Sequence, residues 1–152
     1  MALFGKKTDS TDIFMPEPEK AKAWFERARQ MAESYNFESA FAFFASGFKL
    51  DPRDLEVHKE VLEIATTYNS RGGDPASNKV IKKIDGSSDV DKFVTALFEW
   101  WHDIMNPKLG VKTIVAAVNA EQNKFGAEMA DVILSISQKG KNVLSYKDLK
   151  KI

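Results

Sequence analysis

Residues 21–54 constrain the fold more than any other part of the chain, and they read AKAWFERARQMAESYNFESAFAFFASGFKLDPRD. In the first half, apolar residues recur every three or four positions, at Ala21, Trp24, Ala28, Met31 and Tyr35. After Asn36 the same spacing returns in the second half, at Phe37, Ala40, Phe41, Phe44, Gly47 and Phe48. This spacing predicts two amphipathic helices joined by a turn, the second of which ends at Asp51-Pro52. One such pair cannot bury its own apolar face, so the segment predicts one layer in a stack of helix pairs.

Helical spacing continues to the end of the chain. A third helix follows Pro52, with its apolar face at Leu55, His58, Val61, Leu62, Ala65 and Tyr68. The stretch 69–75 reads NSRGGDP, which predicts a loop before a short helix to about Ile84. Further helices are predicted over about 89–105, 107–122 and 125–139, and a last one from Ser145 to Ile152. In the helix at 89–105 the apolar residues fill an arc of roughly 160°, which predicts the central helix of this half.

The chain is therefore predicted to be an all-α protein of about seven to eight helices. Residues 1–15 show no apolar period and are predicted to be a flexible N-terminal tail, followed by a single helical domain over 16–152. Lys83-Ile84-Asp85 follows Lys49-Leu50-Asp51 by about 34 residues, which indicates a second, degraded copy of the first unit. On that interpretation 16–86 is a repeat pair, although a match of only three residues between two segments can also arise by chance. Residues 87–152 are then either a helical extension or degenerate repeats.

Composition narrows the classes of protein that fit the chain. The 152 residues are 43% hydrophobic and 29% charged and include no Cys, as in an ordinary globular domain without disulfides. The 22 basic residues balance 22 acidic ones, and this zero net charge argues against a general nucleic-acid binder. No apolar run approaches the roughly 20 residues that cross a membrane, and the first residues lack the apolar core of a secretory signal. The chain is predicted to be cytoplasmic, with no membrane contact.

The segment from Ala21 to Asp54 resembles a tetratricopeptide repeat (TPR), whose pattern is W-x2-L-G-x2-Y, then A-x3-F, then P. The positions that match this pattern are Trp24, Ala28, Ala40, Phe44 and Pro52. Arg27 and Met31 depart from it, because Leu and Tyr are usual at those places. The resemblance implies antiparallel helix-turn-helix pairs stacked as a short right-handed solenoid, with a concave groove that holds peptides.

Four residues are candidates for binding a partner. Phe25 and Phe43 lie off the predicted apolar faces, so they are either exposed anchors or contacts with a neighbouring helix. Arg29 is expected to face the groove that the resemblance implies, where it can meet an acidic partner. Trp100 lies at the edge of the apolar arc of its helix and is either core or part of an interface, since Trp is enriched at interface centres. The Lys and Asn clamp that some members of the family use for acidic peptide C-termini is absent.

Two further patterns resemble metal-binding or catalytic motifs but are predicted to have structural roles. Glu99 and His102 have the Glu-x-x-His spacing of di-iron bundles, but a second such pair is missing, so a solvated polar face is expected. His58 lies on an apolar face and is predicted to be a neutral, hydrogen-bonded histidine of the core or of a helix seam. We find no convergent catalytic, metal-ligating or cofactor-binding set and predict that the chain is not an enzyme and needs no cofactor.

The expected function is a non-catalytic protein–protein interaction or scaffold module that binds a peptide or helix in a TPR-like groove. One alternative is a homo-oligomeric structural protein, such as a homodimer that covers the apolar side of the last helix. The other is a weak RNA-binding helical repeat that uses the basic residues near the end, namely Lys139, Lys141, Lys147, Lys150 and Lys151. The sequence does not identify the partner.

Overall fold

The computed structural model describes residues 13–139 of the chain, and side chains as far as residue 136. This part is entirely helical, which confirms the predicted all-α class. Its helices are α1 (Pro18–Glu33), α2 (Phe37–Leu50), α3 (Leu55–Ser70), α4 (Asn78–Ile84), α5 (Asp89–Trp101), α6 (Pro107–Asn119) and α7 (Asn123–Lys139). Most of the expected N-terminal tail, the expected helix from Ser145 to Ile152 and the basic residues after Lys139 lie outside the described residues.

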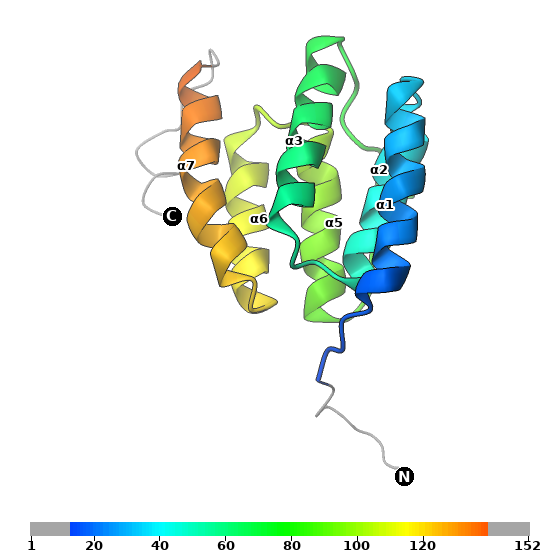
Figure 1. Cartoon of the computed structure of the whole chain (residues 1–152). Coiled ribbons are helices and arrows are strands. Elements are labelled where there is room, and N and C mark those ends of the chain that lie inside the picture. Colours follow the sequence, from blue (N-terminus) through cyan, green and yellow to red (C-terminus); the bar gives the residue numbers. More distant parts are fainter. Residues whose placement is uncertain (1–12, 140–152) are drawn as a thin grey trace.

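The six longer helices are arranged in two layers (Figure 1). In the view of Figure 1, α1, α3 and α7 lie in front of α2, α5 and α6. Within the rear layer α2 packs on α5 and α5 packs on α6, while α1 packs on α2 and α7 on α6 across the layers. The short helix α4 packs on α5. Each long helix therefore buries one face against the other layer, as expected for amphipathic helices.

The second helix pair differs from the repeat predicted over residues 55–86. In such a repeat α4 would lie behind α3 and beside α2, but α5 occupies that place and α4 packs on α5 instead. The physical reason is that α5 has the larger apolar face. The seven residues of α4 include the apolar Val80, Ile81 and Ile84, whereas the 13 residues of α5 include Val90, Phe93, Val94, Leu97, Phe98, Trp100 and Trp101. The longer and more apolar helix takes the interior position.

Local sequence determines where most helices begin. Side-chain oxygens of Asn36, Asp54, Ser77, Ser88 and Asn106 accept hydrogen bonds from backbone N–H groups in the first turns of α2 to α6. At α5, Ser88 and Asp91 cap each other's backbone in a capping box. The cap of α3 is Asp54 rather than the earlier Asp51, whose carboxylate instead accepts hydrogen bonds from Arg53.

One continuous hydrophobic core runs from Ala21 in α1 to Ile133 in α7. Its centre is α5, in which even Thr95 and Ala96 on the side away from Phe93 are buried, so the prediction of a central helix is confirmed. The helix ends at Trp101, four residues before the expected end at Met105. The largest fully buried side chains are Trp100, Trp101, Phe41, Phe44, Phe48, Phe93 and Phe98. None of the described helices is long and apolar enough to cross a bilayer.

Candidate functional site

Phe25, predicted to be an exposed anchor or a contact with a neighbouring helix, is a core residue. It is 4% exposed, and its ring centroid lies 5.0 Å from that of Phe48 and 6.2 Å from that of Phe44. The buried face of α1 is Ala21, Phe25 and Ala28, so Phe25 takes the place expected for Trp24. Gly47 makes this possible, because a Cβ atom there would lie only 2.7 Å from Cδ1 of Phe25. Phe25 is therefore unavailable to a partner.

Trp24 and Phe43 form an aromatic pair on the outer side of the α1–α2 hairpin. Both are half-buried, with ring centroids 5.6 Å apart, and the guanidinium of Arg27 lies 5.5 Å from the centroid of the Trp24 ring. Phe43 is therefore a contact with the neighbouring helix and remains partly open to solvent. The choice between Trp24 and Phe25 for the interior could not be made from spacing, because both follow Ala21 at a helical interval of three or four.

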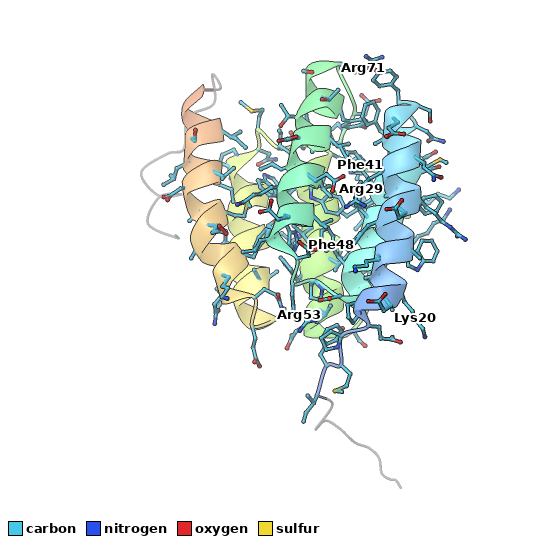
Figure 2. The ribbon with its side chains drawn as sticks, in the orientation of Figure 1. Lys20, Arg29, Phe41, Phe48, Arg53 and Arg71 are labelled. Carbon is cyan, nitrogen blue, oxygen red and sulfur yellow. The ribbon has the colours of Figure 1, made fainter. Side chains whose placement is uncertain are left out.

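Arg29 is bound within the molecule. It lies between α1 and α3 (Figure 2), where its Nε donates to Oε2 of Glu60 at 2.5 Å and its Nη2 donates to Oε1 at 2.9 Å. The hydrogen bond with Glu60 raises the pKa of Arg29, and Glu26 lies 3.6 Å from its Nη1. A bidentate pair of this kind fixes orientation as well as charge. Arg29 holds two helices together and is not the free cation that the sequence led us to expect.

Trp100 belongs to the core rather than to an exposed interface. Its side chain is 2% exposed, and its Nε1 donates to the backbone oxygen of Ile104 at 3.3 Å. The neighbouring Trp101 is 1% exposed and stacks on Phe41, with ring centroids 5.7 Å apart. Both Trp side chains are buried because α2, α3, α4 and α6 all pack against α5.

His58 lies in an aromatic box and confirms the prediction of a core histidine. The ring centroids of Phe48, Phe125 and Phe93 lie 4.0, 4.7 and 5.9 Å from that of His58. Nε2 donates to the backbone oxygen of Pro52 at 2.7 Å, so Nδ1 carries no proton, and Nδ1 has no hydrogen-bond partner among the described residues. Burial lowers the pKa of His58 to about 4. The imidazole is neutral at pH 7 and out of reach of a substrate.

Glu99 and His102 do not share a solvated face, so that expectation is wrong. His102 is 8% exposed and its Nδ1 donates to the backbone oxygen of Phe98 at 2.7 Å, and burial lowers its pKa. The ring of Tyr68 covers it, with centroids 5.3 Å apart. Glu99 instead pairs with Lys112 of α6 at 2.9 Å. The spacing places both residues on one side of α5, but α3 covers the end that carries His102.

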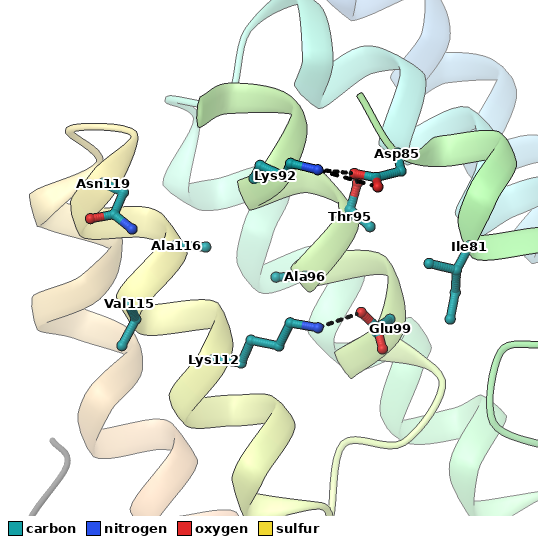
Figure 3. Close-up of a pocket in the computed structure, with 10 residues that line it drawn as sticks. All are labelled: Ile81, Asp85, Lys92, Thr95, Ala96, Glu99, Lys112, Val115, Ala116 and Asn119. Atoms are coloured by element: carbon teal, nitrogen blue, oxygen red, sulfur yellow. Dashed lines mark hydrogen bonds and ion pairs between the residues drawn. The ribbon is translucent and has the colours of Figure 1, made fainter. Parts of the chain in front are cut away.

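A hollow on the rear layer, bounded by α4, α5 and α6, has paired charges (Figure 3). Ala96 and Ala116 lie at its floor. On one side Lys92 lies 3.1 Å from the carboxylate of Asp85, and the hydrogen bond from Lys92 lowers the pKa of that carboxyl group. A second ion pair, between Lys112 and Glu99, lies on the opposite side of the hollow. Because each charge has its partner within the hollow, little electrostatic energy is left for a charged ligand.

A second hollow is the groove between α3 and α7, two helices of the front layer in Figure 1. Its floor consists of apolar side chains, namely Leu62 from α3 and Met129, Val132 and Ile136 from α7. Met129 is fully buried, and the other three are half-buried. Lys59 of α3 crosses one end of the groove, with Nζ 3.7 Å from Oε1 of Glu128. This groove, defined here as the α3–α7 groove, combines an apolar floor with an exposed charged rim.

The apolar residues of the groove floor can be recognised in the sequence, but the groove itself cannot. The spacing that puts Leu62 on the apolar face of its helix also puts Met129, Val132 and Ile136 on one face of theirs. No local pattern, however, shows that α3 and α7 are neighbours, because their residues are more than 50 positions apart in the chain. Only the packing of both helices on the rear layer brings these residues together.

Comparisons of the chain with protein-family models, curated proteins and solved structures find no match. The tetratricopeptide resemblance therefore rests on the residues of 21–54 themselves. Within residues 13–139, no three His, Cys, Asp or Glu side chains are grouped so that they could hold a metal ion. Of the two hollows described, the α3–α7 groove is the one in which an apolar floor borders charges that are not all paired.

Proposed function

We propose that the chain is a non-catalytic protein–protein interaction module that binds a peptide or helix of another protein in the α3–α7 groove. The observation that carries this proposal is the half-buried apolar floor of Leu62, Val132 and Ile136, bordered by exposed charged residues. Interfaces have this composition, with an apolar centre inside a polar rim. In this proposal the α1–α2 hairpin is a TPR-like unit, and the helices that follow pack on it in two layers.

The internal roles of the other candidates support the choice of groove. Phe25 and Trp100 are buried, and Arg29 is held by Glu60. Both histidines are buried against aromatic rings and each donates a ring N–H to a backbone oxygen, which supports a structural role for them. These residues stabilise the stack and leave the groove as the surface on which binding energy can be gained.

The test is a comparison of two variants that each place a carboxylate on an open helix face. Val132→Asp puts the charge on the floor of the groove, whereas Val115→Asp puts it on α6, where Val115 is 49% exposed and lines the other hollow. The full-length chain and both variants are used to capture proteins from cells that express it. We expect the wild type and Val115→Asp to retain the same partner and Val132→Asp to lose it.

Circular dichroism and thermal unfolding establish that both variants are folded before capture. If folded Val132→Asp retains the partner that the wild type binds, the groove is not the binding surface. If Val115→Asp alone loses it, the partner binds the hollow between α4, α5 and α6, and the proposed site is wrong.

A further inference from the structure

The rim of the α3–α7 groove is acidic. Among the described residues that line it, the exposed charged ones are Glu63 on α3, Glu128 and Asp131 on α7, and one cation, Lys59. The ammonium of Lys59 lies 3.7 Å from a carboxylate oxygen of Glu128 and 3.7 Å from one of Glu56, so acidic side chains already neutralise it. Glu63 and Asp131 have no ion-pair partner within 4.0 Å among the described residues. The rim therefore presents uncompensated negative charge beside the apolar floor.

The walls of the groove restrict the shape of what can lie in it. Both walls are α-helices, whose backbone N–H and C=O groups bond within the helix, so an extended peptide would find no backbone partners there. A helix satisfies its own backbone and needs only side-chain contacts. From Met129 to Ile136 the floor extends about 10 Å along α7 at 1.5 Å per residue, which is two helical turns. Anchors at positions i, i+4 and i+7 of a docked helix match that length.

From this charge and shape, and on the basis of the function proposed above, we propose that the occupant of the groove is a cationic amphipathic helix of another protein. Its apolar stripe covers Leu62, Val132 and Ile136. Lys or Arg side chains on its flanks meet Glu63 on one wall and Asp131 on the other. Charge of this sign favours encounter with cationic helices and disfavours acidic ones, because like charges at an interface are repelled.

The probes are two fluorescein-labelled peptides of about 18 residues, long enough for five helical turns. They share one Leu and Ile stripe, and their flanking positions are all Lys in one and all Glu in the other. Fluorescence anisotropy with the full-length chain measures both affinities. We expect the Glu peptide to bind at least about tenfold more weakly than the Lys peptide. Affinity for the Lys peptide is expected to fall severalfold between about 50 and about 300 mM salt.

Charge reversal gives the matched variants. Glu63→Lys combined with Asp131→Lys is expected to reverse the preference between the two peptides. Glu19→Lys combined with Glu33→Lys makes the same change in net charge on exposed positions of α1 and should leave the preference unchanged. Equal binding of both peptides, or a preference that the groove reversal does not alter, would overturn the proposal.

The outcomes separate this inference from the function on which it rests. If Val132→Asp abolishes capture of the natural partner but the Lys peptide does not bind, the groove is functional and the proposed partner chemistry is wrong. If the chain alone forms a dimer that Val132→Asp dissociates, the occupant is a second copy. If replacing Lys147, Lys150 and Lys151 by Ser raises affinity for both peptides severalfold, the occupant is the C-terminal segment of this chain. Either of the last two results would overturn a separate cationic partner.

Discussion

Phe48 and His58 stack face to face, with ring centroids 4.0 Å apart and ring planes 6° apart. The stack joins α2 to α3 and holds the imidazole away from water, which lowers the pKa of His58 from 6.5 to about 4. The unfolded chain therefore binds a proton at higher pH than the folded chain does. The contribution of His58 to stability is fully present above about pH 6.5 and is lost as the pH falls to about 4.

Replacement of His58 by Gln tests this pH dependence, because Gln keeps a donor for the Pro52 oxygen and does not titrate. Over the range from about pH 6.5 to about pH 4, the wild type should lose about 3 kcal/mol more of its free energy of unfolding than His58→Gln does. Urea unfolding followed by Trp fluorescence at several pH values measures the difference. Parallel pH profiles for the two proteins would mean that His58 does not titrate on unfolding in this range.

Gly47 and Gly126 should respond to Ala with opposite signs, although both lie within helices. A Cβ atom on Gly47 would lie 2.7 Å from Cδ1 of Phe25, whose ring is confined by Phe44 and Phe48. We expect Gly47→Ala to lower the free energy of unfolding by about 1–3 kcal/mol through overpacking. At Gly126 the nearest atom would be Cγ2 of Val118 at 3.9 Å, an ordinary contact. Gly126→Ala should raise stability by about 0.5–1 kcal/mol, since Ala favours the helix.

Chemical denaturation of both glycine variants provides the measurement. A neutral or stabilising Gly47→Ala would show that Phe25 can move aside, and that the close approach of α1 and α2 does not require a glycine.

The side chain of Asn69 makes three hydrogen bonds, one within α3 and two to the backbone at the end of α5. Its Nδ2 donates to the backbone oxygens of Ala65 and Trp101 at 2.6 and 2.9 Å, and its Oδ1 accepts from the N–H of Ile104 at 3.3 Å. In Asn69→Asp an oxygen atom would face two carbonyl oxygens, so we expect a loss of about 3 kcal/mol or more. Asn78→Asp is the control, because a negative charge at the start of α4 is tolerated or favourable. Equal thermal stability of the two variants would contradict this role for Asn69.

The Arg29–Glu60 pair should stabilise the packing of α1 on α3 by a modest amount. Its side chains are 38% and 32% exposed, so solvent screens much of the attraction, and a coupling energy of about 0.5–1 kcal/mol is expected. A double-mutant cycle with Arg29→Ala and Glu60→Ala measures it. The exposed pair of Lys20 with Glu17 is the control and should give a smaller coupling. If Arg29→Ala keeps its stability but loses the natural partner, Arg29 is a binding residue after all.

Much of the secondary structure could be predicted from the sequence, because it depends on neighbours in the chain. The apolar residues of α2, α3 and α7 recur every three or four positions, and Asn106-Pro107 marks the start of α6. The same local reasoning placed His58 in the core. It failed at α1, where Trp24 and Phe25 compete for one face, and at His102, which Tyr68 covers from another helix.

The sequence by itself determined that the chain is helical, where most helices lie and which of their faces are apolar, since spacing and capping act over a few residues. The tertiary structure alone decided that Phe25 and Trp100 are buried, that Arg29 is bound by Glu60, and that α5 rather than α4 lies beside α2. It also decided that α3 and α7 meet in a groove. These features depend on contacts between residues far apart in the chain. Local spacing allows several arrangements of nearly equal free energy, and the packing of whole helix faces selects one of them.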